Sequence, residues 1–117
     1  MVGGGVVAPF FIMRRKDKSV SLQGLALEML PILIVVDAKW RRHGQEAVIT
    51  AGTEAFKDDK LIHSAGSLHP FGRALDFRTF YFDLETQQKI RDELLNELSD
   101  DYDIILHKSH IHIEYDP

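Results

Sequence analysis

The feature that most constrains this chain is the alternating run His-Ile-His-Ile-Glu-Tyr at residues 110–115. Side chains on a β-strand alternate between its two faces, so the run predicts a strand with one apolar face and one polar face. The apolar face has to pack against a core. The opposite face then presents His110, His112 and Glu114 side by side.

A second β-prone run covers residues 102–107, and only Lys108 and Ser109 separate it from the alternating run. This spacing predicts an antiparallel hairpin that places His107 opposite His110 on the polar face. Lys-Ser is not a favoured pair for such a turn, so the strands are better determined than their register. Three of the six histidines of the chain would then share one face.

Histidine clusters of this kind point to chemistry, because imidazole is a favoured zinc ligand and a common acid or base. A single histidine elsewhere, such as His43 or His63, is more often a hydrogen-bonded structural residue. The chain contains no cysteine, so disulfides and thiolate catalysis are excluded. Any bound metal must therefore sit on His, Asp and Glu.

The overall composition narrows the class of protein further. A length of 117 residues fits a single domain, 1–117, with its own core. The formal net charge of -4 gives no attraction to nucleic acid, which becomes a minor alternative. The oligomeric state is left open.

The beginning of the chain is apolar but does not resemble a secretory signal. Residues 2–13 contain three consecutive glycines, and the basic residues 14–16 follow the apolar stretch rather than precede it. The stretch is also too short to span a bilayer. Residues 1–19 are expected to form either an N-terminal arm or a first strand.

Between these ends the pattern predicts helices at 21–43 and 83–98 and strands at 47–51 and 74–81. Pro31 lies inside the first helix and predicts a break or kink near Leu30, whereas Asp83 is a suitable N-cap for the second. Together with the hairpin, these elements predict an α+β fold: a small antiparallel sheet with packed helices.

The segment 52–73 is long for a connection without structure, and loops of this length are usually functional or disordered. Near its end, His69 is followed by a turn-permitting glycine and by Asp76 at the start of a strand. With the histidine strand, these two residues supply three nitrogen and oxygen ligands and leave a fourth position open, as a catalytic zinc site requires.

Ser67, His69, Gly72, Ala74 and Asp76 match all five fixed positions of the motif Ser-x-His-x-x-Gly-x-Ala-x-Asp. In this respect the chain resembles the D-alanyl-D-alanine peptidase family. Residues 48–52 resemble the strand that leads into the active-site loop of that family. The final His-Ile-His resembles the His-x-His element of the wider group that includes lysostaphin-type and murein endopeptidases. The resemblance covers roughly residues 20–117.

The resemblance implies a compact α+β fold with one zinc ion and hydrolysis of a peptide bond in peptidoglycan stem or bridge peptides. The activity would be that of a D-Ala-D-Ala carboxypeptidase or an endolysin-like endopeptidase, and phage or prophage lysis is one setting for so small a domain. His69, Asp76 and His112 would be the zinc ligands, with Ser67 as a support. A neighbouring imidazole would take the proton of water and pass it to the leaving amine.

Two departures from the family concern the proton acceptor and the loop. Carboxypeptidase-like members usually carry Glu or Asp three residues before the third ligand, where this chain has Ser109. They often carry an Arg after Ser-Gly-Tyr, where this chain has Ala-Gly-Thr-Glu at 51–54. We therefore expect His110 to be the catalytic base, with His107 as the second candidate. Glu114 is expected to support the ligand strand and is a third candidate.

The missing acidic base also favours an alternative, a catalytically degenerate zinc-binding module with a structural or partner-binding role. A metal-free domain with surface histidines is a third interpretation. The bond that is cut and the route to the cell wall are not specified by the sequence.

Overall fold

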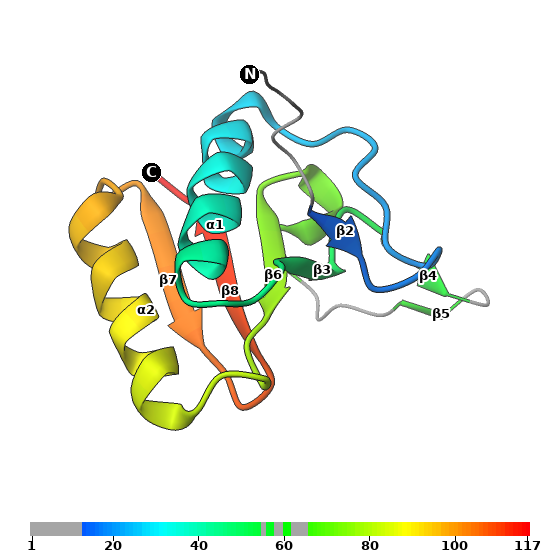
Figure 1. Ribbon diagram of the computed structural model, residues 1–117. Helices are drawn as coiled ribbons and strands as arrows, with labels where there is room; N and C mark the ends of the chain where they lie inside the picture. The colour runs from blue at the N-terminus through cyan, green and yellow to red at the C-terminus, as the bar shows by residue number, and fades with distance from the viewer. Residues whose placement is uncertain (1–12, 55, 58–59, 62–65) are drawn as a thin grey trace, which may run out of the picture.

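The computed structural model describes residues 13–54, 56–57, 60–61 and 66–117. Five strands form one sheet in the order β2-β3-β6-β8-β7, and the two α-helices lie against one side of it (Figure 1). These elements are β2 (Arg14–Arg15), α1 (Leu30–Arg42), β3 (Val48–Ala51), β6 (Ala74–Arg78), α2 (Leu84–Glu97), β7 (Tyr102–Leu106) and β8 (His110–Tyr115). The fold is a small compact α+β fold, in agreement with the sequence-based prediction.

The sheet is mixed, so the prediction of an antiparallel sheet is wrong at one edge. Strand β2 pairs with β3 in parallel, whereas the other three pairs are antiparallel. The reason lies in the connection: α1 separates β2 from β3, and a crossover through a helix returns the chain in its original direction. Within the segment 1–19, a two-residue strand lies at Arg14–Arg15, and residues 1–12 lie outside the described part of the chain.

Helix α1 begins later than predicted. The chain from Ser21 to Ala26 is not helical, and a 3-10 turn η1 (Leu27–Met29) leads into the helix at Leu30. Pro31 lies in the first turn, where its missing N–H is not needed, and it starts the helix instead of kinking it. The helix ends at Arg42, next to Gly44, whose φ of 88° stops it as expected.

Helix α2 begins where the sequence predicts. The Asp83 carboxylate accepts a hydrogen bond of 2.7 Å from the backbone N–H of Thr86, which is the predicted N-cap interaction. Ile90 and Leu94 are fully buried against the sheet.

The hydrophobic core lies between the helices and one face of the sheet. It includes Ile32, Val36 and Trp40 of α1, Ile90 and Leu94 of α2, Leu75 and Phe77 of β6, and Ile111 and Ile113 of β8. Because Ile111 and Ile113 face the helices, the alternating side chains of β8 face the other way. The polar face predicted for the last strand therefore lies on the side of the sheet that the helices leave open.

The C-terminal hairpin forms as predicted. Ile104 lies opposite Ile113, and the backbone N–H of His107 donates to the carbonyl oxygen of His110 at 2.8 Å.

The segment 52–73 is not a plain loop, because it contains a small antiparallel pair, β4 (Phe56–Lys57) and β5 (Lys60–Leu61), and a 3-10 turn, η2 (His69–Phe71). In the described part of the chain, no helix has the length and apolar character to cross a membrane.

Candidate metal centre

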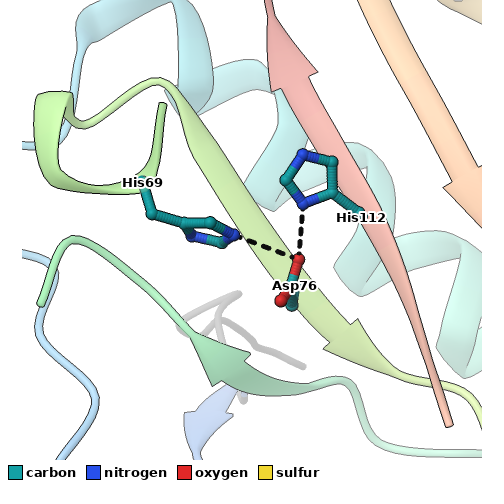
Figure 2. Close-up of side chains that lie close together, drawn as sticks. All are labelled: His69, Asp76 and His112. Atoms are coloured by element: carbon teal, nitrogen blue, oxygen red, sulfur yellow. Dashed lines mark hydrogen bonds and ion pairs between the residues drawn. The ribbon is translucent and has the colours of Figure 1, made fainter. Parts of the chain in front are cut away.

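Two of the three predicted ligands come from neighbouring strands. Asp76 of β6 is the register partner of His112 of β8, and both side chains lie on the face that carries no helix. The His112 Nδ1 atom lies 2.8 Å from Asp76 Oδ1 (Figure 2). Regular antiparallel pairing is thus enough to bring these two groups together.

The third predicted ligand, His69, comes from the turn η2 and reaches the same carboxylate. Its Nε2 atom lies 3.3 Å from Asp76 Oδ1, and the residue is only 4% exposed (Figure 2). Gly72 ends the turn in the left-handed region, with φ 75°. A Cβ atom at this position would lie 2.1 Å from the carbonyl oxygen of Gly24, so the turn can pack here only with glycine.

Together, these three side chains form a group that can hold a metal ion. One ligand atom from each of His69, Asp76 and His112 lies within 4.8 Å of the other two. Tetrahedral zinc, with bonds of about 2.0–2.1 Å, separates its donor atoms by about 3.3 Å. The contact between His69 and Asp76 already has that length.

The outer hydrogen bonds of both rings determine which ring nitrogen faces Asp76. His69 Nδ1 lies 2.9 Å from the carbonyl oxygen of Gly52, which can only accept, so Nδ1 carries a hydrogen and Nε2 is the ring nitrogen that faces Asp76. His112 Nε2 lies 2.7 Å from the Glu114 carboxylate, so Nδ1 is the ring nitrogen that faces Asp76. Two ring nitrogens and a carboxylate oxygen converge in this way on one point, where a shared proton or a bound cation balances the charge of the carboxylate. Outer partners of this kind are typical of metal-binding histidines.

The pKa values of the two strand residues follow from the same contacts. Burial raises the pKa of Asp76, but the hydrogen bonds of His112 and His69 outweigh burial and hold this pKa well below its usual range. For His112, burial lowers the pKa, whereas the hydrogen bonds with Asp76 and Glu114 raise it, and the net pKa lies above the ordinary value. Asp76 is therefore ionised throughout the neutral range.

The predicted supporting residues contact the predicted ligands. The Ser67 hydroxyl accepts a hydrogen bond from the backbone N–H of His69 at 3.2 Å, which fixes the start of the turn. The carboxylate of Glu114 binds the outer nitrogen of His112.

The two histidines predicted as catalytic bases lie next to the ligands, at different depths. The rings of His107 and His110 stack with centroids 4.7 Å apart. His110 is partly buried, with Nε2 3.6 Å from Asp76 Oδ2, whereas His107 is exposed. Burial lowers the pKa of His110 more than the Asp76 charge raises it, so this imidazole is neutral near pH 7.

An open cleft of about 340 Å³ lies beside this group. It is lined by Lys16, Thr50, Ala51, Asp76, Arg78, Phe80, Ser109 and His110. Ser109 stands where carboxypeptidase-like members of the resembled family usually carry Glu or Asp. Its hydroxyl lies 3.2 Å from His110 Nδ1. Of the two candidate bases, His110 is the one that faces the cleft.

Sequence analysis did not predict the residues that position the His69 ring through its outer nitrogen. Gly52 supplies the carbonyl that orients His69, and a Cβ atom on Gly52 would lie 2.0 Å from the carbonyl oxygen of Ser21. The Glu54 carboxylate ties these two segments together by accepting from the N–H groups of Ser21 and Gly52. The only signal for this contact is a glycine directly after a predicted strand.

The histidines outside the cluster have other surroundings. His43 Nε2 lies 3.2 Å from the Glu93 carboxylate, and its ring packs edge-on against Phe82. These contacts agree with the structural role expected for a lone histidine. His63 lies outside the described residues.

Comparison of the chain with protein-family models gives no match, and a search of curated proteins finds no relative.

Proposed function

We propose that this protein is a zinc metallopeptidase that hydrolyses peptide bonds in peptidoglycan stem or bridge peptides. The observation that carries the proposal is the convergence of His69, Asp76 and His112 beside an open cleft. The sequence motif adds the class of reaction, since all five of its fixed positions match those of the D-alanyl-D-alanine peptidase family.

Zinc fits the donor set better than a harder cation does. Two imidazole nitrogens and one carboxylate oxygen are typical zinc ligands, whereas calcium and magnesium prefer oxygen ligands alone. A zinc ion held by His69, Asp76 and His112 would supply Lewis-acid chemistry, which acidifies water and polarises a carbonyl group.

The remaining residues position these groups and move the proton. The Gly52 carbonyl and the Glu114 carboxylate fix the two ligand rings, so Glu114 is already engaged and is not available as a base. His110 faces the cleft and is neutral near pH 7, so it can take a proton from water and deliver it to the leaving amine. His107 stacks on His110 from the exposed side and is the second candidate.

Two measurements on the same preparation test this function. Elemental analysis of protein purified without added metal should find about one zinc per chain, and His69→Ala should lose it; His43→Ala, which removes an imidazole bonded to Glu93 instead, should keep it. Mass spectrometry of a muropeptide digest should show new products with the parent protein and none with His69→Ala. A His69→Ala protein with full zinc content contradicts the ligand assignment.

A second function is favoured by one observation, the serine at position 109 where related enzymes carry an acidic base. In that case the protein is a zinc-binding module that has lost catalysis and serves a structural or partner-binding role. It would bind zinc through the same three ligands yet leave every muropeptide intact, so the digest separates the two functions.

A further inference from the structure

The cleft beside the candidate metal centre is positively charged on an acidic protein. Arg78 and Lys16 line it together with Asp76 and His110, whereas the whole chain has a formal net charge of -4. The Asp76 carboxylate already contacts His69 and His112, so it does not pair with Arg78 or Lys16. The two cations are therefore available to a ligand in the cleft.

Arg78 is placed by the same strand pairing that builds the centre. It follows Asp76 by two residues on β6, so it lies on the same face, and its register partner on β8 is His110. An extended substrate whose scissile bond lies near Asp76 and His110 would extend past Arg78, because neighbouring residues on one strand face are about 7 Å apart.

The backbone and the guanidinium of Arg78 each have a partner, but the charge is not neutralised. Trp40 Nε1–H donates to the backbone carbonyl oxygen of Arg78 at 2.8 Å, and the guanidinium lies 5.3 Å from the centre of the Phe80 ring. Within the described ranges, no ion pair joins Arg78 or Lys16 to a carboxylate. A planar guanidinium in this state is suited to bind a carboxylate through two parallel hydrogen bonds.

We propose that Arg78, with Lys16 beside it, binds a free carboxylate of the substrate peptide and thereby selects the bond that is cut. This inference rests on the proposed peptidase function. Related enzymes carry an arginine after Ser-Gly-Tyr, and Glu54 occupies that position here. In this protein Arg78, a cation from a different strand, takes the place of that arginine. The carboxylate can be the chain terminus or a carboxylate on a residue next to the scissile bond.

A binding measurement tests the inference without turnover. In zinc-loaded protein, the Nε–Hε NMR signal of Arg78 should shift on titration with N-acetyl-D-alanyl-D-alanine and not with its C-terminal amide. Arg78→Gln should weaken binding of the acid by roughly 10-fold or more, the usual effect of losing a hydrogen bond to a charged group, and Arg78→Lys by less. Arg42→Gln, which removes an exposed cation from the end of α1, should bind as the parent does.

Kinetics with paired peptides then identify the source of the carboxylate. If Arg78 binds the terminal carboxylate, amidating the terminus raises KM roughly 10-fold or more in the parent, with kcat less affected, and has little effect in Arg78→Gln. If Arg78 binds the carboxylate of a neighbouring residue, amidating that residue raises KM in the parent instead. The inference is overturned if the Arg78 signal distinguishes neither a peptide with a free terminus nor a peptide with a free carboxylate on the neighbouring residue from the corresponding amide. Failure of the parent to cut any peptide would contradict the proposed function, whereas the binding titration would still decide the role of Arg78.

Discussion

The two histidines of the candidate centre are held by different means. His112 lies on β8, and its outer nitrogen contacts Glu114, a side chain two residues further along the same strand face. His69 lies in the turn η2, and its outer nitrogen contacts the backbone carbonyl of Gly52, 17 residues earlier in the chain. The strand half is therefore built from side chains, and the loop half from backbone.

This difference teaches where each half is vulnerable. A side-chain support can be removed by one substitution that leaves the strand in place. A backbone carbonyl cannot be removed in this way, so the loop half is disturbed only through the close contacts that position it. Those contacts involve Gly52 and Gly72, each of which approaches a backbone oxygen too closely for any Cβ atom.

The largest effect is expected from the strand half, which also carries the proposed base. We expect His110→Ala to retain its zinc and to lose turnover by at least about 10²-fold, the lower end for removal of a general base. The physical reason is that His110 lines the cleft and lies 3.6 Å from Asp76 through its Nε2 atom, whereas the candidate ligand group is His69, Asp76 and His112. Steady-state turnover of a muropeptide together with zinc analysis would measure both quantities.

His107→Ala provides the matched control for this substitution. His107 is exposed and lies at the edge of the centre, stacked on His110 and edge-on to the His112 ring with centroids 6.5 Å apart, so its loss should reduce turnover much less. If His110→Ala remains active while Glu114→Gln is inactive with zinc bound, the base is the carboxylate and the assignment of His110 is wrong.

The sequence predicts the strand half of the site, which carries His112, better than the loop half, which carries His69. The side-chain alternation of β8 follows from the period of a strand, which is why the polar face of His110, His112 and Glu114 was predictable without a structure. That Asp76 lies opposite His112 depends on the register between β6 and β8, which no single strand encodes. The motif resemblance suggested this pairing, and strand physics alone did not.

The loop half and the first edge of the sheet were less predictable, for physical reasons. The contact of Gly52 with His69 joins two segments across a connection whose path is set by tertiary packing. The late start of α1 arises because Pro31 suits a first helical turn as well as it suits a break, and helical propensity does not decide between them. The parallel pairing of β2 involves only two residues, too few for a periodic pattern.

A smaller effect is expected when the support of the strand ligand is weakened. Glu114→Gln keeps the shape of the side chain but removes the charge that accepts from His112 Nε2. We expect zinc affinity to fall by about 10- to 100-fold, the usual cost of losing an outer partner of a metal-binding histidine. Competition with a chromophoric chelator would measure it, and Glu28→Gln, an exposed charge removal at η1, should leave the affinity unchanged. Equal affinities in both variants would show that Glu114 does not support the centre.

The smallest effect separates backbone strain from backbone contact in the loop half. Gly72 and Gly44 both have positive φ, 75° and 88°, so an alanine at either position carries strain of about 1–2 kcal/mol. At Gly72 the new Cβ atom meets the carbonyl oxygen of Gly24 at 2.1 Å, whereas at Gly44 no atom of the described residues lies within 4 Å of it. We therefore expect Gly72→Ala to lower the free energy of unfolding by at least about 1 kcal/mol more than Gly44→Ala, as overpacking typically does. Urea denaturation in the presence of a chelator measures this difference without any contribution from metal.

Since η2 carries His69, the additional stabilisation that zinc gives should also be smaller in Gly72→Ala than in Gly44→Ala. Equal stabilisation by zinc in the two variants would mean that the glycine contact shapes the fold but does not position the loop ligand.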